Sequence, residues 1–424
     1  MSTGHDIRAS LQTALLDAGR YFGRIAGFQH NARAYLVGTF LMGLGHGAVW
    51  VHLNLYYRAI GLGEETIGRL LASSSLGTVL MAIPAALLVD RVPAQFVFAG
   101  AAIGYAVAIG SQLFAPNAWV LSALAVLAGM SFTVHWAAAA PFFMRNSTSQ
   151  ERIYLFGFSH AIETTATILA AVGVGWISRM AAARVGSELL GLRWALVVVA
   201  AVSFAALFAF LRIDSPPPAE RSRRLLSYLK PKDWRLIVRL IVPSALVGLG
   251  AGLIIPFLNL YFRDRFGQNP FEIGGFFAVS QFFTVLGFLS GPAVAKRFGI
   301  VATVCLTQLL SIPFFLTLAF TQSLHLAVLS FWMRGSLMNM NHPLMTNFAM
   351  EIVGPDQQSV TNSLRMLAWN LSWMVSTQVG GYVIERHGFS PPMLMTIGLY
   401  FVATILTWVF WRDRTQVGKP ASAA

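Results

Sequence analysis

Residues 43–58 read GLGHGAVWVHLNLYYR, and residues 248–263 read GLGAGLIIPFLNLYFR. Nine of the sixteen paired positions are identical, at a spacing of 205 residues. One extra residue in the second copy then moves the spacing to 206, so that Ile67-Gly68 pairs with Ile273-Gly274. Two matching apolar halves predict a membrane protein whose halves can rock around a shared central site, which is the architecture of a transporter.

Composition restricts the class of protein. Hydrophobic residues make up 56% of the chain and charged residues 11%, against roughly 45–50% and about 25% in soluble proteins. Most of the surface is therefore expected to face lipid. A single cysteine, Cys305, excludes a disulfide framework and a thiolate metal cage. The charged first 30 residues do not resemble a cleavable signal peptide.

The net charge of +13 is distributed unevenly. If the N-terminus is cytoplasmic, twenty of the thirty Lys and Arg residues fall on cytoplasmic segments and seven on the opposite side. This bias orients membrane proteins, so it is interpreted as a topology signal and not as a nucleic-acid surface. We expect a multi-pass protein of the cell membrane with both termini in the cytoplasm.

Twelve apolar runs are long enough to cross a bilayer core of ~30 Å. The first six lie at 34–57, 67–88, 96–114, 119–142, 154–177 and 194–211, and the second six at 236–262, 272–294, 300–320, 324–348, 358–383 and 391–411. The expected organisation is an N-terminal arm at 1–33, six-helix bundles at 34–211 and 236–411, a basic linker at 212–235 and a tail at 412–424. The arm is expected to be either an interfacial helix or disordered, and a short interfacial helix is expected near 225–229.

The twelve spans, the 6 + 6 repeat and the basic central loop resemble the major facilitator superfamily. Its motif between spans 2 and 3 is matched at Asp90-Arg91, although Ala86 and Pro93 replace its glycines. The second-half counterpart keeps its glycines and has Lys296-Arg297. The resemblance implies an all-α fold of two pseudo-symmetric six-helix bundles. It also implies a cytoplasmic gate at Asp90, Arg91, Lys296 and Arg297, which could instead be ordinary charged turns that fix topology.

Glu163 is the only acidic residue deep in a predicted span. His160 lies three residues before it, on the same helix face. A desolvated carboxylate holds protons more readily, and a neighbouring imidazole titrates near neutrality. Glu163 and His160 are therefore the candidates for proton coupling or substrate contact. The alternative is a structural pair that ties span 5 to a neighbouring helix.

Arg365 lies on a polar stripe of span 11 that also carries Trp369. An arginine there could receive a carboxylate or phosphate, or it could neutralise Glu163 across the cavity. Arg334 in span 10 poses the same choice with less support, since a lone arginine can snorkel. A charge in mid-membrane costs about 2.5–3.5 kcal/mol, so the charges that are retained usually face a cavity.

The remaining polar residues of the spans complete the predicted substrate site. Span 1 presents His46, Trp50 and Asn54 on one face, and span 7 repeats the last of these as Asn259. Symmetric packing or gating would explain the two asparagines equally well. The other candidates are His135, Gln281, Asn341 and His342. Spans 3, 6, 9 and 12, which the family places on the lipid side, carry few polar groups.

These features favour a secondary transporter that works by alternating access. The chain has no Walker-type phosphate loop, so ATP drive from this chain is not expected. The first expectation is export of a small amphiphile, with proton coupling as a hypothesis. The alternatives are uptake or exchange of an organic anion, or transport of a lipid-like molecule.

A membrane enzyme or receptor is a further alternative, although no Ser-His, paired-Asp or His-Glu-x-x-His constellation is recognised. We therefore expect no enzyme, no cofactor and no metal. The expected partners are a small-molecule substrate, protons and the lipid bilayer. The expected state is a monomer.

Overall fold

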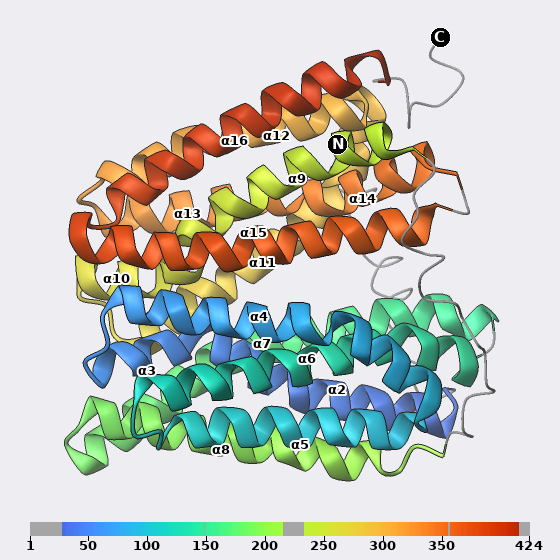
Figure 1. Cartoon of the computed structure of the whole chain (residues 1–424). Coiled ribbons are helices and arrows are strands. Elements are labelled where there is room, and N and C mark those ends of the chain that lie inside the picture. The colour runs from blue at the N-terminus through green and yellow to red at the C-terminus, as the bar shows by residue number, and fades with distance from the viewer. Residues whose placement is uncertain (1–27, 148, 215–232, 355–356, 415–424) are drawn as a thin grey trace, which may run out of the picture.

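The computed structural model describes residues 28–147, 149–214, 233–354 and 357–414. Within these ranges the chain forms two bundles that lie side by side, each with six helical segments (Figure 1). The N-terminal bundle consists of α2 (His30–Ala48), η2 (Val49–Leu53) and α3 (Asn54–Ala59) as one broken segment, then α4 (Glu64–Arg91), α5 (Ala94–Gln112), α6 (Ala118–Asn146), α7 (Ser149–Val185) and α8 (Glu188–Phe210).

The C-terminal bundle repeats this order. It consists of α9 (Trp234–Ile254), η4 (Ile255–Phe257) and α10 (Leu258–Phe266) as one broken segment, then α11 (Pro270–Phe298), α12 (Ile300–Phe320), α13 (Leu324–Asn339) with α14 (Asn341–Ile352), α15 (Gln358–His387) and α16 (Ser390–Trp411). The turn η5 (Arg412–Arg414) follows. The predicted all-α fold of two bundles is confirmed. The interfacial helices expected in the N-terminal arm and near 225–229 lie outside the described residues.

Ten helices in the described part of the chain are long and apolar enough to cross a membrane. The two remaining segments are α13 with α14, which is broken at Met340, and α15. Both are among the spans in which the sequence places charges and amides. The protein is therefore a multi-pass membrane protein, and α13 and α14 fall outside the ten because they are only 16 and 12 residues long.

The sequence repeat is also a structural repeat. The π-helix Val49–Leu53 and the 3-10 turn Ile255–Phe257 interrupt the first segment of each bundle at matching positions. In the second copy Pro256 lacks an N–H and so cannot continue the α-helical hydrogen bonds. The Tyr56 and Tyr261 hydroxyls each donate a 2.7 Å hydrogen bond to a backbone oxygen, of Leu113 and Leu318 respectively, again 205 residues apart.

The bundles meet along α4 with α15 and α7 with α11. We call the side where α2 begins and α16 ends the terminal face, and the side with the α3–α4 and α10–α11 turns the opposite face. Gly68 on α4 lies against the backbone oxygen of Thr377, and its counterpart Gly274 on α11 lies against that of Ala171. A Cβ at either glycine would clash with that oxygen, so glycine permits the close approach of the helices near the opposite face.

Candidate functional site: the central cavity

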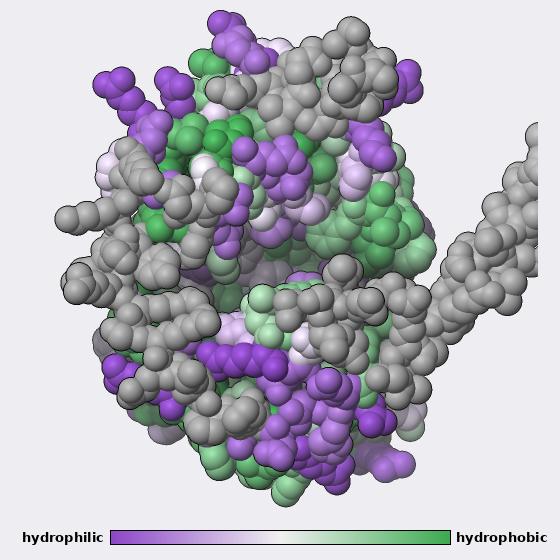
Figure 2. Space-filling model, turned by 90° about the vertical axis from the view of Figure 1, so that its right-hand side faces the viewer, coloured by the Kyte–Doolittle hydropathy of each residue, from purple (hydrophilic) through white to green (hydrophobic). Residues whose placement is uncertain are grey.

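A cavity of about 910 Å³ lies between the two bundles. Its lining includes α2, η2 and α7 on one side and α9, α11, α13, α14 and α15 on the other. The lining continues through Met345 and Thr346 of α14 and Asn362 of α15, towards the terminal face. Seen from that face, the surface is hollowed between the bundles (Figure 2). The cavity therefore opens towards the terminal face.

Most of the substrate-site residues predicted from the sequence line this cavity. They are His46, Trp50, Glu163, Gln281, Asn341, His342, Arg365 and Trp369. Arg334, which the sequence supported less strongly, lines it too. The structure thus brings together residues from both halves that lie up to 323 positions apart in the chain.

Glu163 provides the only carboxylate among the lining residues. It lies on α7 where that helix packs against Gly43 of α2: a Cβ at Gly43 would lie 2.9 Å from the Ala166 Cβ and 3.5 Å from the Glu163 Cα. The glycine therefore lets α2 approach α7 at the level of the carboxylate. Within the described chain, no hydrogen bond or ion pair holds the Glu163 side chain.

The wall formed by the C-terminal bundle carries two arginines. Arg334 is 5% exposed, and its guanidinium lies 5.0 Å from the centre of the Phe315 ring. The Nε atoms of Arg334 and Arg365 are buried and have no hydrogen-bond partner among the described residues. No ion pair joins Glu163 to Arg365 in the described structure, so the ion pair considered from the sequence is not formed in this conformation.

Three tryptophans from both bundles form a row in the cavity lining. The rings of Trp50 and Trp373 are 6.3 Å apart between centroids, with an interplanar angle of 29°. The rings of Trp373 and Trp369 are 6.2 Å apart at 24°. Trp373 was not among the residues selected from the sequence. Near-parallel aromatic rings of this kind favour stacking with planar groups.

Asn54 and Asn259 correct one expectation, because they are buried outside the cavity lining. The Asn54 Nδ2 donates to the Pro256 oxygen at 2.7 Å, and the Asn259 Nδ2 donates to the Val51 oxygen at 2.8 Å. Each asparagine therefore caps a backbone oxygen in the helix break of the other bundle. This reciprocal pair agrees with the packing or gating alternative and not with substrate contact.

The two other histidines predicted for the substrate site, His135 and His160, also lie outside the cavity lining. His135 is 5% exposed and stacks on Tyr35, with centroids 6.1 Å apart and an interplanar angle of 4°, inside the N-terminal bundle. His160 is exposed, and its ring lies 5.7 Å from that of Trp136. His160 and Glu163 therefore do not both face the cavity. The histidine that lines the N-terminal wall is His46, stacked on Phe132 at 4.2 Å.

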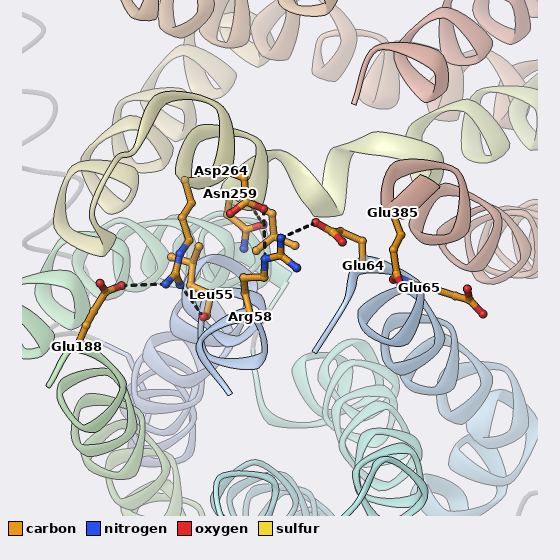
Figure 3. A network of polar contacts seen from close by, with 10 residues as sticks. Leu55, Arg58, Glu64, Glu65, Glu188, Asn259, Asp264 and Glu385 are labelled. Atoms are coloured by element: carbon orange, nitrogen blue, oxygen red, sulfur yellow. Dashed lines mark hydrogen bonds and ion pairs between the residues drawn. The ribbon is translucent and has the colours of Figure 1, made fainter. Parts of the chain in front are cut away.

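Polar contacts close the interface between the bundles at the opposite face (Figure 3). Arg58 pairs with Asp264 of the other bundle at 3.4 Å and with Glu64 of its own bundle at 3.4 Å. Arg263, the counterpart of Arg58, donates to the Leu55 oxygen at 2.9 Å and pairs with Glu188 at 3.3 Å. With the Asn54–Asn259 pair, these contacts form what we call the polar seam.

Two further contacts extend the polar seam along α4 and α15. Arg386 pairs with Glu65 at 3.1 Å. The backbone N–H of Glu65 donates to the Glu385 carboxylate at 2.7 Å. The opposite face is therefore held shut by hydrogen bonds and ion pairs from both bundles.

The predicted gate residues lie at the terminal ends of α4 and α11. Asp90 pairs with Arg145 at 3.3 Å inside the N-terminal bundle. Arg297 lies 5.3 Å from the centre of the Phe298 ring of its own helix. No ion pair of Asp90, Arg91, Lys296 or Arg297 crosses between the bundles in the part of the chain that the structure describes. Their role as a gate remains a prediction.

Comparison with known proteins identifies the group to which this architecture belongs. The family model described as Major Facilitator Superfamily matches residues 35–377 and, again, 240–424. The sequence has no significant match among curated proteins.

Solved structures with the same fold include one transporter and bacterial homologues of two others. The nucleoside transporter NupG matches at 16% identity and a TM-score of 0.74, over 91% of this chain and 99% of that one. A bacterial homologue of the human lysosomal transporter Spinster, inward-facing and unoccupied, matches at 15% and 0.75, over 95% and 99%. A bacterial homologue of the iron transporter ferroportin, inward-facing, matches at 15% and 0.69, over 90% and 98%. At these identities the likeness concerns the fold.

Proposed function

This chain belongs to the Major Facilitator Superfamily, and we propose that it is a secondary transporter that moves a small organic solute by alternating access. One observation carries the proposal: a polar cavity between two pseudo-symmetric bundles is accessible from one face and closed by the polar seam at the other. Rocking of the bundles would close the terminal face and open the opposite face. The excess of Lys and Arg on the terminal side supports a cytoplasmic location for that face, so this conformation is inward-facing.

Glu163 is our candidate for coupling to protons. It is the only acidic side chain in the lining, and no described cation neutralises it. A carboxylate that is desolvated when the cavity closes can take up a proton on one side and release it on the other. His160 does not support this step from its present position, whereas His46 lines the same wall.

Flux into proteoliposomes under an imposed pH gradient tests the coupling. Because glutamine keeps the shape and cannot titrate, Glu163→Gln is expected to abolish gradient-driven accumulation while exchange without a gradient continues. Glu351→Gln, on the exposed surface of α14, is the matched control. Unchanged accumulation in Glu163→Gln would remove Glu163 from the coupling role.

The direction of transport and the solute are open to two proposals. Export of a small amphiphile is supported by the apolar part of the lining, which includes Val247, Phe277, Met338 and Met345. Uptake or exchange of an organic anion is supported by the two arginines of the C-terminal wall. Flux measured in both directions with the same solute would separate them, since an exporter accumulates it in inside-out vesicles.

A further inference from the structure

The unpartnered polar atoms of the cavity share one chemical character. Among the lining residues, the buried side-chain nitrogen and oxygen atoms without a hydrogen-bond partner in the described structure are Arg334 Nε, Asn341 Nδ2 and Arg365 Nε. All three are N–H donors, and all three belong to the C-terminal bundle. A buried donor without an acceptor is costly, and an acceptor from outside the chain, either water or a bound solute, would satisfy it.

The charges of the two walls point the same way. The C-terminal wall carries two guanidinium groups and the N-terminal wall one carboxylate. Arg334 is 95% buried and faces a phenyl ring, not a carboxylate. A guanidinium group presents paired donors that match a carboxylate, phosphate or sulfonate. An anionic group on this wall would therefore satisfy charge and hydrogen bonding together.

The tryptophan row supplies the second half of the site. Trp369 lies one helical turn from Arg365 on α15, and Trp373 lies one turn further along. Trp50 belongs to the N-terminal bundle and is 40% exposed. A planar ring that stacked on this row would contact both bundles while its anionic group stayed close to Arg365.

We propose that the cavity binds a planar organic anion, whose anionic group is held by Arg365 and whose ring stacks on the row of Trp50, Trp373 and Trp369. This inference rests on the proposed function, because it takes the cavity to be the substrate site. It names the chemical class of the substrate and assigns the recognition of charge to one bundle.

Binding to the purified full-length protein tests the substrate class without requiring transport. The probes are indole-3-acetate, indole-3-acetamide, tryptamine and tryptophan, which share a ring and differ in charge. Phenylacetate and phenylacetamide form a second acid–amide pair. A ligand that binds the folded state raises the unfolding temperature by mass action. The acids are expected to stabilise the protein, with affinities about tenfold or more above those of their amides.

Two substitutions separate the two parts of the site. Arg365→Gln is expected to lose about tenfold or more of the affinity for indole-3-acetate while binding of indole-3-acetamide changes little, because only the charged contact is removed. Trp373→Leu is expected to weaken the acid and the amide alike. Arg184→Gln removes one charge from an exposed position on the opposite face and is expected to leave both affinities unchanged.

Three results would overturn the proposal: equal affinity for acid and amide, tighter binding of tryptamine or tryptophan than of indole-3-acetate, or no stabilisation by any probe. These results are distinguishable from failure of the proposed function. Alternating access is followed independently by the rate at which a cavity cysteine is alkylated from each side of the membrane. Bundles that exchange access without binding the acids would refute the substrate class alone, and bundles that never exchange access would refute the transport mechanism.

Discussion

The two ends of the interface between the bundles are built differently. At the opposite face, α4 and α11 pack directly on α15 and α7, and the polar seam crosses between the bundles. At the terminal face, the Asp90–Arg145 pair stays within one bundle and the cavity opens between the two. The contacts that must break in the proposed transport cycle are therefore concentrated at one end.

The seam and the cavity also differ in how far they preserve the repeat. In the seam, Asn54 and Arg58 are matched by Asn259 and Arg263 at a spacing of 205. In the cavity, Glu163 corresponds to Trp369 at a spacing of 206, and His46 corresponds to Ala251 at 205. The repeat has kept the asparagines and arginines that join the bundles, although their acidic partners Glu64, Glu188 and Asp264 have no acidic counterparts, and it has diverged at these cavity positions.

The largest effect is expected from a methyl group at the closest approach of the bundles. In Gly274→Ala the new Cβ would meet the Ala171 backbone oxygen, which cannot move aside as a flexible side chain can. This clash can be relieved if α11 moves away from α7. The substitution should therefore destabilise the present conformation by up to about 3 kcal/mol. Amide hydrogen exchange at the start of α11 is expected to accelerate. Gly173→Ala, which meets no atom within 4 Å, is the control, and equal exchange in both variants would contradict the prediction.

A smaller shift is expected from the reciprocal asparagines. Asn54→Ala with Asn259→Ala removes two hydrogen bonds between the bundles, worth about 1 kcal/mol each. The double substitution should destabilise the present conformation by about 2 kcal/mol. A cysteine introduced at Ser244, which lines the cavity, should then be alkylated more slowly by a reagent applied from the terminal side. The cysteine at position 244 is introduced into a Cys305→Ala variant, which removes the single native cysteine.

Tyr261→Phe is the matched control for the asparagines, since it removes a buried hydrogen bond within one bundle. It is expected to lower thermal stability without changing the alkylation rate. If the asparagine variant and the tyrosine variant behaved alike, the reciprocal pair would be ordinary packing and not part of the seam.

The smallest effect is expected from the ion pairs of the seam. The Arg58 and Asp264 side chains are 36% and 24% exposed, and pairs of this kind contribute about 0–1 kcal/mol. Asp264→Asn should therefore change the alkylation rate less than about threefold, a factor that matches roughly 0.6 kcal/mol. High salt should reduce the difference further. A change of about tenfold in the alkylation rate would contradict this prediction, because the pair would then contribute more free energy than its exposure allows.

The fold could be predicted from the sequence because the repeat and the lengths of the apolar runs indicate two halves of six spans each. The polar residues of spans 10 and 11 fit the same fold, since they are expected to face a central cavity. It also selected Glu163, Arg365 and Trp369, since charged and aromatic residues retained within polar spans tend to face a cavity. The same reasoning misplaced His135, whose ring packs among aromatic side chains inside one bundle.

Two other misplacements have geometric causes. His160 and Glu163 are three residues apart, which leaves them about 60° apart around the helix, enough to separate a cavity wall from its neighbouring surface. The reciprocal bonds of Asn54 and Asn259 depend on how two distant helix breaks meet across the bundles. The residue spacing within either helix carries no information about that contact, because the two segments lie 205 positions apart in the chain.

The most direct test of the rocking-bundle account measures two distances in one protein. In a Cys305→Ala background, spin labels at Val185 and Gln322 report on the opposite face, and labels at Phe96 and Phe298 report on the terminal face; all four positions are exposed. In liposomes, Asn54→Ala with Asn259→Ala is expected to populate a longer opposite-face distance together with a shorter terminal-face distance. Distances that change in the same direction, or a change at one face only, would contradict alternating access by rigid rocking of the two bundles.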